Sequence, residues 1–223
     1  MNWTINACLP TALLGLISMA ATAQNLNKVN QKIDRNCYVL KEKYTALQAN
    51  PEIRHGYYFA SISSYDEEGQ YTQGQRSGVW TCSTTGIVLH KYDFDQHKEI
   101  QGVPSKLVTR ISIKDPGTGQ SKDLPVQNIY LGGDTKMLKV VVNCLRYPAE
   151  AAEKRITGKV RIRFVLGADG KMRDEVPLTN LGGGLEGEAL RVFRLMPQDW
   201  LPVFIDGKPV DAEVEMLLAF NLS

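Results

Sequence analysis

The chain of 223 residues lacks the short motifs that mark the common classes of enzyme. It has no G-x-S-x-G nucleophile elbow, no H-E-x-x-H zinc motif, no phosphate-binding P-loop and no dinucleotide-binding fingerprint. The three histidines, His55, His90 and His97, are the side chains suited to general-base chemistry near neutral pH, and none stands in a known catalytic context. We therefore predict a protein that is not an enzyme, with no catalytic residues and no cofactor.

Cysteine and net charge are also scarce. A net charge of +2 gives no dense basic surface, which argues against nucleic acid as a partner. Beyond the N-terminal region the cysteines are Cys37, Cys82 and Cys144, so at most one internal disulfide can form and one thiol is left over. Which of them pair, if any, is left open. Cys144 stands at a helical core spacing, and we interpret it as a small buried hydrophobe.

No cluster of cysteine and histidine with zinc-ligand spacing is present, and we predict no metal site. Asp93, Asp95 and His97 form the alternative. They would share one face of a strand and could bind a cation there, but the solvated face of a hairpin is the favoured interpretation.

Residues 1–23 are predicted to be a signal peptide and not part of the fold. The segment 7–23 is apolar or small and uncharged, and it ends in Ala21-Thr22-Ala23, the pattern read by signal peptidase. An uncleaved membrane anchor is the alternative, although the run is short for a span and contains Pro10. We expect an exported, periplasmic protein.

The next part of the chain divides into two segments. Residues 24–56 form a polar lead-in with a predicted short helix near 37–49. Residues 57–127 alternate β-formers with turn signals such as Asp66-Glu67-Glu68-Gly69 and Gly74-Gln75-Arg76-Ser77-Gly78, which predicts an antiparallel meander of hairpins. Within this segment, residues 74–94 resemble a degenerate MORN-like repeat in the spacing of glycine, Trp80 and Tyr92.

Residues 128–223 predict a second unit with both helices and strands. Lys159 to Leu166 alternates strictly and is followed by a tight turn at 168–171 and a second strand over about 172–178. A helix is predicted over 186–196, and the chain closes with an alternating strand from Val210 to Leu222. The order is β-hairpin, helix, β-strand.

The final strand carries the strongest functional signal. Its polar face bears Asp211, Glu213 and Glu215, and the polar face of 159–166 bears Lys159, Arg161 and Arg163. Opposite charges stabilise facing antiparallel strands by about 0.2–1 kcal/mol per pair, so we predict that the two strands are neighbours. The result is an α+β fold with an antiparallel three-stranded sheet in the order 2-1-3, a helix packed on it, and the final strand at an edge. An edge strand can accept a foreign peptide as an added strand.

The C-terminal unit resembles the TonB C-terminal domain. The residues that carry the resemblance are Arg146-Tyr147-Pro148-Ala149-Glu150, Gly158-Lys159-Val160, Asp169-Gly170-Lys171, Met196-Pro197 and Gly207-Lys208-Pro209-Val210. The preceding Leu131-Gly132-Gly133-Asp134 looks like the lead-in of TonB-like proteins of the Bacteroidetes type.

The resemblance implies a periplasmic domain that binds the TonB box of a TonB-dependent outer-membrane transporter as an added strand. It further implies an inner-membrane complex of ExbB and ExbD as the source of energy for transport. The partner-binding residues implied on the final strand are Asp211, Glu213, Val214, Glu215 and Leu217. An exposed edge also pairs with itself, so a strand-mediated homodimer is an additional expectation.

The sequence also departs from TonB. The apolar N-terminal run has no preceding Lys or Arg and no His, and the 10 prolines are scattered instead of forming a long spacer. A soluble exported scaffold without energy coupling is therefore kept as the alternative function.

Overall fold

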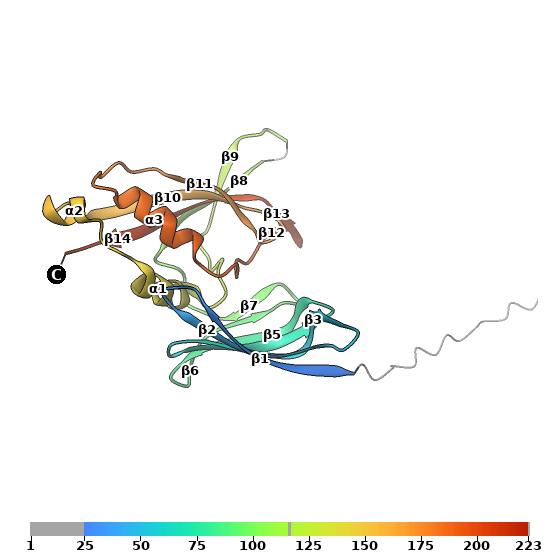
Figure 1. Cartoon of the computed structure of the whole chain (residues 1–223). Coiled ribbons are helices and arrows are strands. Elements are labelled where there is room, and N and C mark those ends of the chain that lie inside the picture. The colour runs from blue at the N-terminus through green and yellow to red at the C-terminus, as the bar shows by residue number, and fades with distance from the viewer. Residues whose placement is uncertain (1–24, 116, 223) are drawn as a thin grey trace, which may run out of the picture.

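The computed structural model describes residues 25–115 and 117–222, which form two antiparallel sheets, one small hairpin and three helices. The predicted signal peptide at 1–23 lies outside the described residues. Figure 1 shows the two sheets one above the other, with α1 (Gly133–Cys144) between them.

The first sheet is a seven-stranded meander in which each strand pairs with the next along the chain. This confirms the predicted run of hairpins and extends it toward the N-terminus. The strands are β1 (Leu26–Asp34), β2 (Val39–Leu47), β3 (Asn50–Ile62), β4 (Tyr65–Thr72), β5 (Gln75–Thr84), β6 (Ile87–Asp93) and β7 (Lys98–Gln101).

The predicted helix near 37–49 is wrong, because β2 occupies most of this segment. Its inward-facing residues include Glu42, which is buried, so a charged residue interrupted the apolar alternation that marks a strand. The predicted turn at 66–69 is also wrong, since these residues lie within β4. Gly69 is required there by packing: a Cβ atom at this position would lie 2.4 Å from the ring of Trp80.

The second sheet has five strands in the order β11-β10-β14-β8-β9. The strands are β8 (Val108–Lys114), β9 (Ser121–Leu124), β10 (Gly158–Leu166), β11 (Met172–Pro177) and β14 (Ala212–Phe220). The predicted pairing of 159–166 with the final strand is confirmed, with nine consecutive positions in register. The predicted 2-1-3 order is the part β11-β10-β14 of this sheet.

The edge position predicted for the final strand is wrong. β8 pairs with β14 on the side away from β10, and β9 extends the sheet further. Both strands come from the segment 57–127, which we had assigned to the hairpin region, so that segment contributes to both sheets.

Helix α3 (Leu185–Arg194) packs on one face of the second sheet, where Phe193 contacts Phe164 of β10. Trp200 packs against both of these rings and covers the core beside the helix. A short helix α2 (Ala149–Glu153) and the hairpin of β12 (Val203–Ile205) with β13 (Lys208–Val210) complete this unit. In the described part of the chain, no helix is long and apolar enough to cross a membrane.

A disulfide joins the first sheet to α1. Cys37, in the turn between β1 and β2, is bonded to Cys144 at the end of α1, across a sequence separation of 107 residues. Cys144 is buried, as predicted, but it is a cross-link and not simply a small hydrophobe. Cys82 is the remaining free thiol in the described chain, and its burial raises its pKa to about 12.

Candidate functional site

The five residues predicted to bind a partner lie on or next to β14. Asp211 immediately precedes the strand, and its carboxylate accepts a hydrogen bond from the backbone N–H of Ala168 at 2.8 Å. Val214 is fully buried on the core face. Glu213 and Glu215 lie on the opposite, polar face, and Leu217 is half-buried.

The polar face of the second sheet is a network of opposite charges. Glu215 lies 3.6 Å from Arg161 and 3.4 Å from Arg110 of β8, and Glu213 lies 3.7 Å from Arg163. The contacts between β10 and β14 are diagonal, because Arg163 stands directly opposite Glu215 and Val165 stands opposite Glu213. The charge complementarity that predicted the pairing is therefore present, but the ion pairs join diagonal residues and not residues that stand directly opposite each other.

β8 occupies the outer edge of β14 over Glu213–Met216. The pairing contains a bulge at Glu215 and Met216, and it continues with a hydrogen bond from the Leu217 N–H to the carbonyl of Leu107 at 2.9 Å. Two side chains of β8, Val108 and Ile111, are buried in the core. A peptide could add to this side of β14 only by replacing β8.

The N-terminal end of β8 is held by Asp134 in the first turn of α1. The Asp134 carboxylate accepts hydrogen bonds from the backbone N–H of Lys106 at 2.6 Å and of Leu107 at 3.3 Å, and from the hydroxyl of Ser105. A carboxylate is a strong acceptor for such groups, so this residue fastens the segment that leads into β8.

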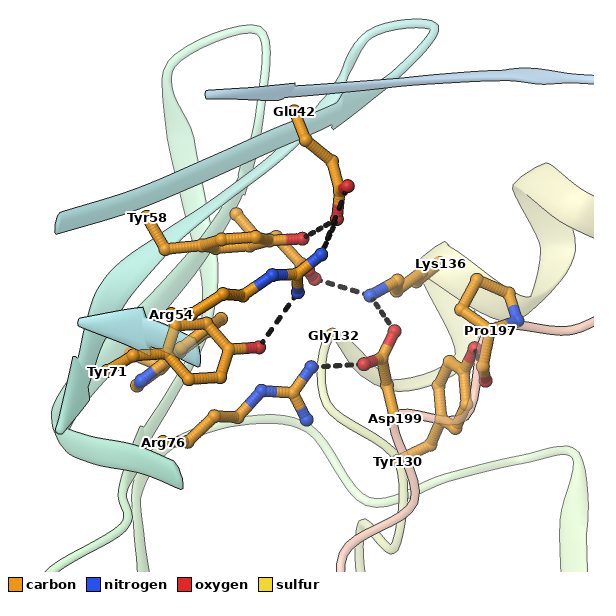
Figure 2. Close-up of polar contacts among 12 residues, drawn as sticks. Glu42, Arg54, Tyr58, Tyr71, Arg76, Tyr130, Gly132, Lys136, Pro197 and Asp199 are labelled. Carbon is orange, nitrogen blue, oxygen red and sulfur yellow. Dashed lines mark hydrogen bonds and ion pairs between the residues drawn. The ribbon is translucent and has the colours of Figure 1, made fainter. Parts of the chain in front are cut away.

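A second candidate site, which the sequence analysis missed, is a buried cluster of charges between the first sheet and the C-terminal unit (Figure 2). Lys136 of α1 reaches across the interface, where its ammonium group contacts the carboxylates of Glu67 on β4 and Asp199, the latter at 2.5 Å. Asp199, which follows α3, also pairs with Arg76 of β5. The Lys136 side chain is 2% exposed.

The same cluster continues along the inner face of the first sheet. Arg54 of β3 contacts Glu42 of β2 at 3.0 Å, and the hydroxyl of Tyr58 donates to Glu42 at 2.7 Å. The Arg54 guanidinium lies over the rings of Tyr44 and Tyr58, and that of Arg76 lies over Trp80, at 4.7–5.0 Å from the ring centroids. Such stacking lets a guanidinium group be buried among aromatic side chains.

The protonation states follow from these contacts. Burial opposes ionisation of Asp199, but the charges of Lys136 and Arg76 and their hydrogen bonds outweigh it and hold the pKa of that carboxyl well below its usual range. Burial likewise opposes the charge on Lys136, yet Asp199 and Glu67 raise its pKa. The pKa of Glu67 is raised, mainly by burial, with Lys136 acting against it.

A cavity of about 250 Å³ adjoins the cluster. Its walls include Arg54, Glu67 and Lys136, together with Leu40 of β2 and Gln198. The three cations and three carboxylates of the cluster balance one another in charge, and the Lys136 ammonium group lies between the carboxylates of Glu67 and Asp199. In the described residues no group of three or more His, Cys, Asp and Glu side chains has metal-site geometry.

The cluster therefore joins the first sheet to α1 and to the segment after α3. Removing one member of a buried ion pair leaves an uncompensated charge, which is strongly destabilising. Together with the Cys37–Cys144 disulfide, these pairs fix the first sheet against α1 and the segment after α3.

The histidines and the Asp93, Asp95, His97 group have structural contacts. His90 is buried, and its Nδ1 accepts the backbone N–H of Gly132 at 2.9 Å; burial lowers its pKa, with Glu99 opposing. Asp93 ends β6 and accepts the N–H of Asp95, while His97 stacks on Phe204 at 4.3 Å. The aspartates and His97 thus lie at a turn and do not share the face of one strand.

A sequence signal for the buried cluster exists in the period of two. Glu67 lies an even number of positions from the buried Tyr65 and Tyr71. Arg76 likewise lies an even number of positions from the buried Trp80 and Cys82, so each charged residue falls on the inward face of its strand. Because we had assigned both segments to turns, we did not use the alternation along a strand to place Glu67 and Arg76 on a buried face.

Comparison with protein families gives one match, over residues 143–222, to the family described as Gram-negative bacterial TonB protein C-terminal. The match covers the end of α1, α2, β10, β11, α3 and β12–β14, but it does not extend to the MORN-like segment at 74–94, which gains no support. A comparison with curated proteins and one with solved structures each give no match. The resemblance of the C-terminal unit to the TonB C-terminal domain is thereby confirmed for residues 143–222.

Proposed function

We propose that this protein is a TonB-like component of the bacterial envelope, which binds a periplasmic segment of a TonB-dependent outer-membrane transporter by strand addition. The observation that carries the proposal is the family match over 143–222, which coincides with the hairpin, helix and strand formed by β10, β11, α3 and β14. The Cys37–Cys144 disulfide supports a location in an oxidising compartment such as the periplasm. ExbB and ExbD as further partners remain a prediction.

The binding position that we propose is the side of β14 now filled by β8. The β8–β14 ladder is short and bulged, whereas β10 and β14 pair over nine consecutive positions without a bulge. A partner strand in this place would need apolar side chains where Val108 and Ile111 stand and a basic one where Arg110 meets Glu213 and Glu215. Each buried apolar side chain that is displaced costs about 1.5–3 kcal/mol, which the incoming strand has to replace.

The second candidate is the soluble exported scaffold without energy coupling. It is favoured by the same observation that complicates the first proposal, which is that β8 already pairs with the outer side of β14. The disulfide and the ion pairs also hold the first sheet to the C-terminal unit. In that case the C-terminal sheet would be a closed structural unit, and partners would bind elsewhere.

A cross-link between β8 and β14 separates the two functions. Arg110 and Glu215 stand directly opposite each other, so the double variant Arg110→Cys, Glu215→Cys can form a disulfide that locks β8 in place. Binding of TonB-box peptides from transporters of the same bacterium would be measured by fluorescence anisotropy for the locked protein, the two single variants and the parent chain.

If β8 gives way to the transporter segment, the parent and single variants bind the peptide and the locked protein loses binding at least tenfold. Equal binding by locked and parent proteins would place the partner on another surface. A lack of binding by all four proteins, with the fold intact, would favour the scaffold.

A further inference from the structure

The edge of the first sheet formed by β1 differs from the other sheet edges. β1 pairs with β2 over nine consecutive positions without a bulge, and no other strand in the described part of the chain pairs with its far side. The edges formed by β7 and β9 have four residues each, and the β10–β11 pairing at the opposite edge of the second sheet contains an irregularity. A long regular edge is a template for pairing with another strand. We propose that two copies of this protein associate through their β1 edges as an antiparallel pair.

The hydrogen-bond pattern shows which residues of β1 present free backbone groups. The N–H of Arg35 donates to the carbonyl of Tyr38, and the N–H of Gln48 donates to the carbonyl of Asn25, both in the register of the β1–β2 ladder. Because hydrogen-bonded and non-hydrogen-bonded pairs alternate along an antiparallel ladder, the odd-numbered residues of β1 bond to β2. The even-numbered residues direct their N–H and C=O groups to the outer edge: Leu26, Lys28, Asn30, Lys32 and Asp34.

The charges select one register for a twofold pair. With the symmetry axis at Gln31, Lys28 stands opposite Asp34 of the second copy, and Val29 stands opposite Ile33 of the second copy. Both outer pairs are then of opposite charge, and two apolar pairs gain contact on the half-buried face. The neighbouring register, centred on Asn30, would place Lys28 against Lys32 twice and is opposed by like charges.

Lysines on an edge strand usually discourage pairing. In the register centred on Gln31, Lys28 stands opposite the carboxylate of Asp34 of the second copy, and Lys32 stands opposite Asn30 of the second copy. The two lysines therefore act against the wrong register more than against pairing itself. The proposed surface lies on the first sheet, away from β8 and β14, so it is independent of the proposed transporter binding.

Charge reversal provides the test. The parent protein, purified as the cell processes it, is expected to show a concentration-dependent monomer–dimer equilibrium in sedimentation velocity. Lys28→Glu alone sets Glu against Asp34, and Asp34→Lys alone sets Lys against Lys28; each variant is expected to raise the dimer Kd at least tenfold. An equimolar mixture of the two variants restores both opposite-charge pairs, and the mixed dimer is expected to re-form.

A backbone variant supplies a second measurement. Asn30→Pro removes an N–H that points to the outer edge and leaves the β1–β2 hydrogen bonds in place, so it should abolish the dimer with little change in Tm. Asn30→Ala is its matched control and should still dimerise. Because Asp34 also accepts the N–H of Asn36 in the turn, the Tm of Asp34→Lys is measured beside it.

Three results would overturn the proposal. They are a parent protein that stays monomeric at the highest concentration measured, a dimer that survives Asn30→Pro and both charge reversals, and a mixture of the two charge variants that associates no better than either alone. None of them bears on the test of transporter binding with β8 cross-linked to β14, because the β1 variants leave the second sheet unchanged.

Discussion

Of all single side chains, we expect Lys136 to lower the free energy of unfolding most when it is removed. Its ammonium group is the shared partner of Glu67 and Asp199, all three side chains are buried, and Lys136→Met would leave two carboxylates facing each other beside Arg76 alone. We expect the variant to lower the free energy of unfolding by about 3–5 kcal/mol. Urea unfolding followed by tryptophan fluorescence would measure this change.

Lys154→Met is the matched control. Lys154 forms an exposed ion pair with Glu150 on α2, and its side chain is 63% exposed. Such a pair contributes about 0–1 kcal/mol. Equal losses for the two lysine variants would contradict the role assigned to the buried cluster.

Asp199 makes the stability of the protein sensitive to acid. Because Lys136 and Arg76 outweigh burial and hold the pKa of Asp199 below its ordinary value, the folded protein keeps this carboxylate ionised where the unfolded chain takes up a proton. Its contribution is present above about pH 4, the pKa range of an unfolded aspartate, and is lost as the pH falls through the lower folded pKa.

The stability difference between the parent and Asp199→Asn should therefore be largest near neutral pH and should shrink below about pH 4. Chemical denaturation at a series of pH values would show it. Glu67, whose pKa is raised mainly by burial and also by Asp199, has the opposite dependence, so the same comparison is repeated with Glu67→Gln in both proteins to remove its contribution. A difference that stays constant down to the lowest pH would contradict the assignment.

At the scale of elements, the strands that could be predicted are those in which apolar and polar residues alternate regularly along one continuous segment. The β10–β14 pairing could be predicted because both strands carry strict alternation and complementary charges, and the structure has them in register over nine positions. β2 was mistaken for a helix because its inward set contains the buried Glu42. A charged residue can occupy a core position only when a distant partner neutralises it, and Arg54 is 12 residues away in the chain.

The place of β8 could not be predicted, for a different reason. Val108 to Lys114 has a clear strand composition, but its neighbour β14 lies about a hundred residues later, and nothing local distinguishes membership of the first sheet from membership of the second. Four of the five predicted site residues lie on β14 and Asp211 immediately precedes it, yet their exposure depends on this non-local pairing. The strand itself was predicted correctly, and only its position at the edge of the sheet was wrong.

Asp134 controls how firmly β8 is seated. Its carboxylate accepts two backbone N–H groups, from Lys106 and Leu107, and the Ser105 hydroxyl. Asp134→Ala leaves these donors without their charged acceptor, and we expect a loss of about 1.5–3 kcal/mol. Faster hydrogen exchange should concentrate at the amides of residues 106–112.

Thr135→Ala in the same turn of α1 serves as the comparison for Asp134→Ala, with exchange in 106–112 expected to match the parent. If transporter binding requires β8 to leave β14, Asp134→Ala should also bind the TonB-box peptide more tightly than the parent. Uniformly increased exchange across both sheets would instead mean that Asp134 supports the whole fold and not β8 in particular.

At the scale of the whole molecule, two kinds of contact hold the first sheet to the C-terminal unit. One is the charge cluster centred on Lys136, and the other is the disulfide between Cys37 and Cys144. The disulfide closes a loop with a sequence separation of 107 residues, which contains all strands from β2 to β9 and most of α1. A cross-link over so long a loop restricts the unfolded chain and stabilises the fold by about 2–5 kcal/mol.

The double variant Cys37→Ser, Cys144→Ser should lose that amount in denaturant unfolding, and a reducing agent should lower the parent to the level of the variant. The variant itself should not respond to reduction, because the remaining thiol, Cys82, is buried and has no disulfide partner in the described chain. Cys82, with its pKa raised to about 12, should also resist alkylation until the protein unfolds. A parent protein whose unfolding is the same with and without reductant would show that the ion pairs alone hold the two units together.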